Sequence, residues 1–295
     1  MSEYMIVPTD SIDATADAIK AKLGSQADLT WGQDGFADAV DAIQSGYSLE
    51  DIFGSNTPFS GNIIYTSEDI SQISFQGRPI TGFTAPNLIG YPFGYKAGTD
   101  HGVFAGCTSL VFLDAPKWPR LSDGHNNGNT NLEWFKLPLA KYVGASGFKD
   151  CKKLQYAVLP CAYILYTSAF QNCTSLEAFD GGGEATETSS VGFQRQTAFS
   201  GCTKLNTIVI RRADVIWALT NINVFTNTPF ASGGSGGTLY VPSSLISSYQ
   251  SATNWSTILG YTNNQIKSIE STHTDPNATL DLTLYYADGT LIPTS

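Results

Sequence analysis

Charge is scarce in this sequence, and bases are scarcer than acids. Only 14% of the 295 residues are charged, and 16 Lys and Arg stand against 26 Asp and Glu, which gives a formal net charge of −10. Such a chain is a poor match for nucleic acid or an anionic membrane, because both attract basic surfaces. Aromatic residues make up 12% of the chain. We therefore expect a surface of small polar residues with some exposed rings, as in proteins that bind sugars or other proteins.

Long apolar runs and an export signal are also missing. The longest uncharged apolar run, residues 156–166, has 11 residues and contains Pro160, whereas a membrane-spanning helix needs ~20. The first 20 residues hold four acidic residues and no base before Lys20, unlike a secretory signal, which starts with a basic region. We expect neither a transmembrane helix nor export by the general secretory route.

Closely spaced cysteines and histidines are absent too. The five cysteines, at 107, 151, 161, 173 and 202, form no Cys-x-x-Cys pair, and the chain has three histidines. Zinc sites and disulfide frameworks depend on such spacings or on an even number of cysteines. The sequence therefore predicts reduced, buried thiols and no metal or cofactor.

What the chain does contain is an internal repeat. The pattern Phe-x-x-Cys-x-x-Leu occurs four times, over Phe104–Leu110, Phe148–Leu154, Phe170–Leu176 and Phe199–Leu205. The leucines are 44, 22 and 29 residues apart, so the first gap holds a degenerate copy, which ends at Leu132 and has Asn129 in place of cysteine. Pro86, Pro116, Pro138 and Pro160 keep the same phase. We interpret residues 80–86 as an earlier copy without its own Phe and Cys.

This pattern resembles the BspA-like leucine-rich repeats of bacterial and phage surface proteins, over about residues 80–270. The resemblance implies an α/β, β-rich fold: a leucine-rich repeat solenoid in which each repeat, or rung, gives one short parallel strand and a tight return. One rung cannot bury its own Phe and Leu, whereas stacked neighbours share a continuous core. Four cysteines would then be small core residues, namely Cys107, Cys151, Cys173 and Cys202.

The two ends differ from the repeats. Apolar residues at helical spacing predict helices over 11–24 and 36–46. The segment Ala16–Gly24, with Trp31 and Gly35–Val40, is similar to a small module near the start of tail and baseplate-associated proteins of phages and prophages of Gram-positive bacteria.

Patterning also predicts a domain organisation. Residues 238–242 predict a final strand, 243–253 a short helix, and the alternation from Leu280 to Tyr286 a hairpin. We therefore expect a helical attachment module over 1–46, a capping or linker segment over 47–79, the solenoid with its C-terminal cap over 80–270, and a hairpin tail over 271–295.

One face of the predicted strands carries the candidate binding residues. Side chains at positions 3 and 5 of a rung point outward. Position 3 of three consecutive rungs is Phe112, Trp134 and Tyr156, and position 5 adds Asp114 and Lys136. With rungs ~4.8 Å apart, the rings would span about 10 Å, roughly two sugar rings. We expect a platform for a glycan or a protein. The alternative is that the rings stack along the sheet for stability or are covered by a loop or a partner.

Catalysis is not expected. A glycosidase needs two converging carboxylates, and Asp114 and Asp180 are three rungs apart, or ~14 Å. His101, Asp123 and His125 fall in a loop rich in Gly and Asn, where we interpret them as turn residues and not as metal ligands.

The leading functional hypothesis is a non-enzymatic phage virion protein, a tail, baseplate or fibre component. Residues 1–46 would attach to other virion proteins, and the solenoid would bind a glycan or protein of the host surface. The protein would be made in the host cytoplasm and released by lysis. The alternatives are a bacterial cell-surface adhesin, a capsid-decorating head fibre and an intracellular scaffold. Neither nucleic-acid binding nor membrane insertion is expected, and the sequence leaves open whether the chain forms a homo-oligomer.

Overall fold

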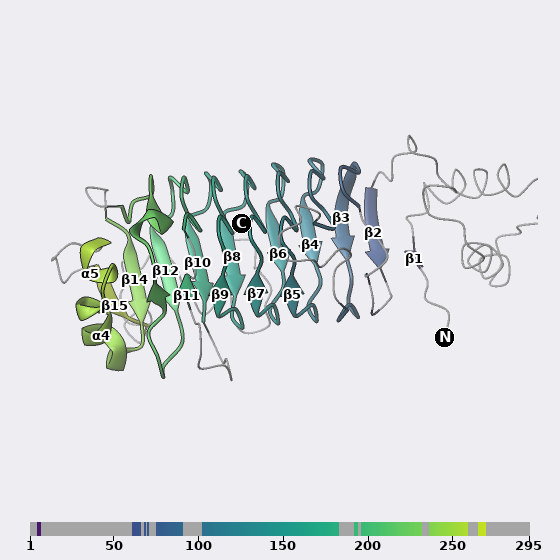
Figure 1. The fold of residues 1–295 in the computed structure, drawn as a ribbon. Coiled ribbons are helices and arrows are strands. Elements are labelled where there is room, and N and C mark those ends of the chain that lie inside the picture. The colour runs from purple at the N-terminus through teal and green to yellow at the C-terminus, as the bar shows by residue number, and fades with distance from the viewer. Residues whose placement is uncertain are drawn as a thin grey trace, which may run out of the picture.

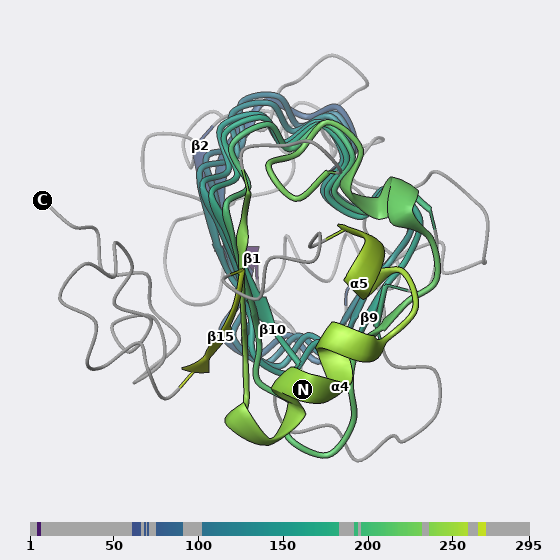
Figure 2. The same cartoon turned by 90° about the vertical axis from the view of Figure 1, so that its left-hand side faces the viewer.

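The computed structural model is a solenoid made of two stacks of short strands (Figure 1). It describes residues 5–6, 61–65, 68, 70, 75–90, 102–182, 192–193, 196–231, 236–258 and 265–269. Viewed along the solenoid axis, the two stacks lie on opposite sides of the interior (Figure 2). Buried side chains of the repeats fill that interior.

The first stack comprises two five-stranded sheets. One contains β1 (Met5–Ile6), β2 (Gly61–Tyr65), β3 (Ile80–Thr84), β4 (Phe112–Asp114) and β6 (Trp134–Lys136). The other contains β8 (Tyr156–Leu159), β10 (Ala178–Gly181), β12 (Thr207–Ile210), β14 (Thr238–Val241) and β15 (Ile266–Ser268).

The second stack is a sheet of shorter strands, β5 (Arg120–Leu121), β7 (Tyr142–Val143), β9 (Ile164–Leu165), β11 (Gly192–Phe193) and β13 (Ala218–Leu219). The pairings of these strands are parallel, and β1 is antiparallel to β2.

Strand register follows the repeat. Phe112 pairs with Trp134, and Ala178 pairs with both Tyr156 and Thr207. Equivalent positions of successive repeats therefore lie side by side, which confirms the predicted leucine-rich repeat solenoid. β2 pairs in parallel with β3, so the stack includes a strand ahead of residue 80.

The phenylalanines of the repeat stack into a ladder inside the solenoid. Phe148, Phe170, Phe199 and Phe225 follow one another with ring centroids 5.1, 5.5 and 5.8 Å apart. Phe75 stacks on Phe104 in the same way, at 5.6 Å. The interpretation that the rung of β3 has no Phe is therefore wrong. Gly82 and Phe112 are register partners on neighbouring strands. The segment from Phe75 to Gly82 is one residue shorter than the segment from Phe104 to Phe112, so the repeat spacing does not reveal Phe75.

Each repeat cysteine lies in the core beside the rung before it. Thiol groups donate to backbone carbonyl oxygens of that rung: Cys107 to Phe75, Cys151 to Asn126, Cys173 to Phe148 and Cys202 to Phe170. All five cysteines are free, these four are buried, and Cys161 is half-buried. Burial raises the pKa of the Cys107 thiol to about 12, so it stays protonated and can donate. The prediction that these four are core residues is confirmed.

The degenerate copy before β6 replaces the apolar pair with hydrogen-bonded amides. Asn126 takes the phenylalanine position, and Asn129 takes the cysteine position, as predicted. Asn129 Nδ2 donates to Asn126 Oδ1 at 3.2 Å. Asn126 in turn lies 3.0 Å from Nδ1 of His125. All three side chains are buried, so this rung has a polar interior.

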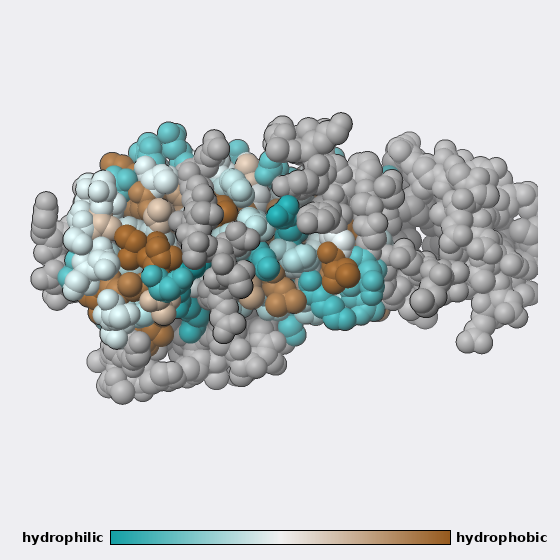
Figure 3. Space-filling model, turned by 60° about the horizontal axis from the view of Figure 1, so that its bottom comes forward, coloured by the Kyte–Doolittle hydropathy of each residue, from teal (hydrophilic) through white to brown (hydrophobic). Residues whose placement is uncertain are grey.

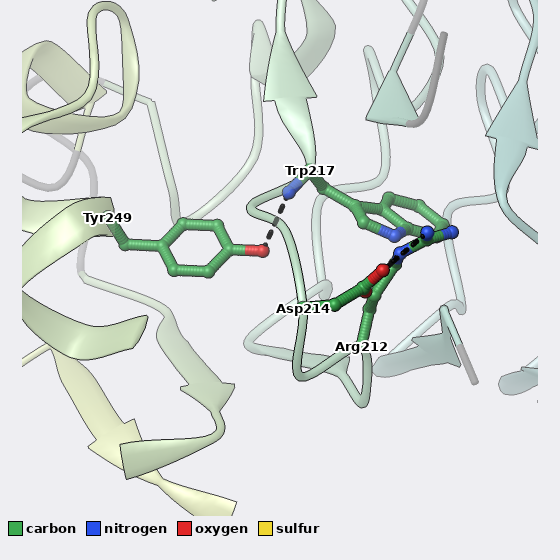
Figure 4. A network of polar contacts seen from close by, with 4 residues as sticks. All are labelled: Arg212, Asp214, Trp217 and Tyr249. Atoms are coloured by element: carbon green, nitrogen blue, oxygen red, sulfur yellow. Dashed lines mark hydrogen bonds and ion pairs between the residues drawn. The ribbon is translucent and has the colours of Figure 1, made fainter. Parts of the chain in front are cut away.

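The C-terminal cap consists of short helices that cover the last rung. A 3-10 helix over Ser243–Leu245 leads into α4 (Ile246–Ser251), and α5 (Trp255–Ile258) follows. The predicted strand over 238–242 and helix over 243–253 are thus confirmed. The hydroxyl of Tyr249 accepts a hydrogen bond from the backbone N–H of Trp217 at 2.8 Å (Figure 4).

The helices predicted over 11–24 and 36–46, and the hairpin predicted over 271–295, lie outside the described residues. Among the residues that the structure describes, no helix is long and apolar enough to cross a membrane.

Candidate binding surface

The aromatic strip, defined as Phe112, Trp134 and Tyr156, lies on the outward face of β4, β6 and β8. Phe112 and Asp114 flank the buried Leu113, and Trp134 and Lys136 flank the buried Phe135. This alternation arises because successive side chains of a strand point to opposite faces of the sheet. All five predicted site residues are half-buried on this face.

Two rings of the strip stack on each other. The rings of Phe112 and Trp134 are 4.9 Å apart and lie within 7° of parallel. The Phe112 ring also fills the space that a Cβ atom on Gly82 would need. Phe112 is therefore enclosed between the Gly82 rung and Trp134.

Tyr156 makes a polar contact with the following rung. Its hydroxyl donates to Oε2 of Glu177, on the following rung, at 3.4 Å. The backbone pairing is also interrupted here. β6 and β8 are neighbours in the solenoid but belong to different sheets. Trp134 and Tyr156 thus lie on adjacent strands at the junction of the two sheets.

Charged side chains beside the strip occur in opposite-sign pairs. Asp114 and Lys136 are register partners on β4 and β6. Burial raises the pKa of Asp114, and the nearby Lys136 ammonium acts in the opposite direction. Oδ1 of Asp114 is buried without a hydrogen-bond donor. Glu133, which precedes Trp134, pairs with Lys153 at 3.5 Å, and both are exposed.

Asp180 lies at an outward position but is not exposed. The residue is 2% exposed, and its carboxylate accepts two hydrogen bonds from Arg211, at 3.0 and 3.1 Å. Burial raises its pKa to about 7, although the Arg211 guanidinium opposes the shift. Ala178 and Val209 on the same face of β10 and β12 are buried as well. The outward positions of β10 and β12 are therefore covered, and the candidate surface ends at β8.

The sequence analysis did not identify the two consecutive arginines, Arg211 and Arg212, as structural residues. The signal that could have found them is their position directly after a predicted strand in a chain with few basic residues. Arg212 is also buried, and it donates to both carboxylate oxygens of Asp214 at 2.6 and 2.9 Å (Figure 4).

The residues considered as metal ligands have structural partners. His125 is fully buried, its ring lies 5.4 Å from Phe104 and 4.6 Å from Trp118, and burial lowers its pKa to about 3. Oδ1 of Asp123 accepts the N–H of Ala145 at 2.7 Å. No group of three or more metal-ligating side chains occurs within the described ranges, and His101 lies outside them.

Exposed apolar side chains are scattered over other parts of the described surface. The large ones are Ile64, Ile89, Leu139 and Ile222. Ile89 and Leu139 lie in turns that follow β3 and β6, two rungs apart. On the face drawn in Figure 3, the coloured hydrophobic residues are divided by hydrophilic ones. The aromatic strip, in contrast, combines stacked rings, strand register and paired charges, so it is the candidate binding surface.

A parallel solenoid with a repeated Phe, Cys and Leu core defines a leucine-rich repeat protein. The family model described as the BspA type leucine-rich repeat region matches residues 98–216 and 125–252, in six copies, together more than half of the chain. The chain belongs to this family, whose repeats indicate a surface-binding, adhesin-like role. A comparison with curated proteins gave no match.

Proposed function

We propose that the protein is a non-enzymatic component of a phage virion, in the tail, the baseplate or a fibre. In this proposal the solenoid binds the host-cell surface through the aromatic strip and its flanking residues Asp114 and Lys136. The N-terminal residues 1–46 bind other virion proteins. The protein is made in the host cytoplasm and leaves the cell by lysis.

The observation that carries the binding role is the stacked pair of Phe112 and Trp134 on adjacent strands. Aromatic side chains supply a large contact area at a low entropy cost, since they have few rotatable bonds. Stacking and strand pairing hold these rings in place before any ligand arrives. Such preorganisation favours affinity, because less freedom is lost on binding.

The virion role rests on the resemblance of the N-terminal segment to modules of phage tail proteins. It is tested by imaging. Particles from the source culture are labelled with an antibody against residues 80–270 and viewed by negative stain. We expect label at the tail tip, and label on the capsid would instead favour a head fibre. Particles that stay unlabelled, although the antibody detects the purified protein, contradict the virion role.

A cell-surface adhesin is the second candidate, and the family match favours it. The same antibody distinguishes the two roles when it is applied to intact, unlysed cells. Label on the cells together with bare particles supports the adhesin. Binding of purified protein to host cells is expected in either case.

A further inference from the structure

One rung of the solenoid has a polar core. The polar rung, residues 122–143, comprises the turn that contains Asn126 and Asn129 together with β6 and β7. An amide therefore separates Phe104 from Phe148 in the phenylalanine ladder. In the part of the chain that the structure describes, three buried polar atoms of this turn have no hydrogen-bond partner: Ser122 Oγ, His125 Nε2 and Asn129 Oδ1. Buried polar groups without partners lower the stability of the structure around them.

The direction of the hydrogen bonds in this turn fixes the neutral form of His125. Asn129 Nδ2 donates to Asn126 Oδ1, so the Asn126 amide presents its Nδ2 to Nδ1 of His125, 3.0 Å away. Nδ1 is therefore the acceptor, and the single ring proton is on Nε2. A second proton would go to Nδ1, where it would set two donors against each other and break this hydrogen bond.

The surroundings of His125 also oppose a charged ring. The imidazole packs against Phe104 and Trp118, and burial lowers its pKa to about 3. The titratable groups buried on the adjacent turns are the thiols of Cys107 and Cys151. No charged group of the described residues contributes to the pKa shift. Those on the segments packed against His125 are half-buried or exposed, namely Lys117, Arg120, Asp123, Lys149, Asp150, Lys152 and Lys153.

The polar rung is joined unevenly to the rung of Phe148, which contains β8 and β9. β6 and β8 belong to different sheets, whereas β7 pairs in parallel with β9. Inside, Phe135 stacks on Phe148 at 4.7 Å, and the Cys151 thiol donates to the carbonyl of Asn126. On the other side of the polar rung, β6 is paired with β4. The weakest backbone connection is therefore between β6 and β8.

We propose that this boundary is an acid-sensitive joint, where protonation of His125 opens the solenoid between β6 and β8 while the pairing of β7 with β9 keeps the two halves connected. Opening lets water reach the imidazole, whose ordinary pKa is 6.5. Each pH unit below 6.5 should favour the open form by about tenfold, because opening takes up one proton. This inference goes beyond the proposed function and does not depend on it.

The repeat cysteines report where the chain opens. The Cys151 thiol lies across the proposed joint, whereas the thiols of Cys107 and Cys173 lie across other boundaries. The full chain is treated with dithiodipyridine, a thiol reagent, at pH 7.5 and pH 5, and peptide mass spectrometry gives the labelling rate of each cysteine. The rate of Cys151 relative to the other two cancels the pH dependence of the reagent. We expect this ratio to rise about thirtyfold at pH 5, as uptake of one proton requires.

Variants assign the effect to His125. His125→Phe keeps a ring against Phe104 and Trp118 but cannot titrate, so the ratio should change less than about threefold between the two pH values. Asp123→Asn is the matched control. It removes the neighbouring charge and keeps an oxygen that accepts the N–H of Ala145, so the rise of about thirtyfold should remain.

A pH profile of the unmodified protein is the second measurement and needs no variant. The ratio should be level above pH 6.5 and rise about tenfold for each unit below it. A ratio that stays level down to pH 4.5, or that rises as much in His125→Phe as in the unmodified protein, overturns the joint. Equal acceleration at Cys107, Cys151 and Cys173 overturns it as well, because acid then unfolds the solenoid as a whole.

Discussion

Gly82 is required at the residue scale because the Phe112 ring lies over it. A Cβ atom at this position would overlap ring carbons of Phe112. Gly82→Ala should displace the ring, disturb its stacking on Trp134 and lower the free energy of unfolding by about 1–3 kcal/mol, as overpacking does. Urea denaturation measures the change. In a Phe112→Ala background the same substitution should cost less, although the oxygen of the exposed Asn62 side chain, 2.5 Å from that Cβ position, would still have to move. An equal cost in both backgrounds would contradict the overlap with Phe112.

The ion pair between the buried Asp180 and the half-buried Arg211 predicts a pH-dependent cost of mutation. Removal of Arg211 in Arg211→Met leaves a buried carboxylate unpaired, which should lower stability by about 3 kcal/mol near pH 8. The Asp180 pKa is about 7 in the folded protein against an ordinary 3.8, so the folded state holds the proton more tightly than the unfolded state. Stability from this group is therefore greatest below pH 3.8 and is lost as the pH rises through 7.

Without the guanidinium the Asp180 pKa rises further. Near pH 5 the carboxyl is then protonated, and the destabilisation should shrink to less than about half of its value near pH 8. Chemical denaturation at the two pH values measures this difference. Asp180→Asn combined with Arg211→Met is the control, and its stability should vary less with pH. A loss that is the same at both pH values would mean that the cost comes from lost packing.

The sequence predicted which side chains share a face of a strand. It did not predict which of them are buried by other residues that pack on that face. The two-residue period of a strand places Phe112 with Asp114 and Trp134 with Lys136. The same period gives Asp180 an outward position, although it is buried against Arg211 from the following turn. Burial on the outer face depends on what packs there, and a repeat pattern does not encode that.

At the element scale, the C-terminal cap completes the hydrogen bonds of an edge strand with side chains. Among the strands that the structure describes, β13 ends its sheet, so the outer backbone groups of β13 and Trp217 have no further described strand to pair with. Tyr249 accepts from the N–H of Trp217, Trp255 donates to its carbonyl, and Asn254 donates to the carbonyl of Leu219. Side chains thus take the place of the missing strand, and the exposed edge that invites aggregation is covered.

Tyr249→Phe tests this role of the cap. It keeps the ring but leaves the buried N–H of Trp217 without an acceptor, so stability should fall by about 1–3 kcal/mol. Ser248→Ala, on an exposed position of α4, is the control and should change stability little. Denaturation gives the free energy, and amide hydrogen exchange at Trp217 should become faster. Unchanged exchange at Trp217 would mean that the hydroxyl is not what protects this edge.

The cap helices were predictable, and their contacts with the edge strand were not. Ser243 to Thr253 shows a local helical pattern, whereas Tyr249 and Trp217 are 32 residues apart. Local patterning reports the period of an element and carries no information about its partner. Phe75 was not predicted as a ladder residue for a different reason. The segment between Phe75 and its strand is one residue shorter than the repeat pattern requires.

At the scale of the whole molecule, the solenoid is a one-dimensional stack. Strand pairs, the phenylalanine ladder and the cysteine hydrogen bonds all join one rung to the next. Stability in such a protein is approximately a sum of rung terms and neighbour terms. A destabilising substitution at one end should therefore lower the local stability most at that end.

Weakening the cap should accordingly produce a gradient of local unfolding. In Trp255→Ala the capped end loses a buried ring and a donor to the Trp217 carbonyl, so the backbone of β13 and of β14 and β15, which end the two stacks, should open first. Hydrogen exchange resolved by peptide should show protection falling most around 217–219 and 238–241, less around 178–181, and little around β6. Phe170→Ala, in the middle of the ladder, is the comparison, and its loss of protection should be centred on β8 and β10. If both variants lower protection equally along the whole chain, the solenoid unfolds as a single cooperative unit and neighbour terms dominate its stability.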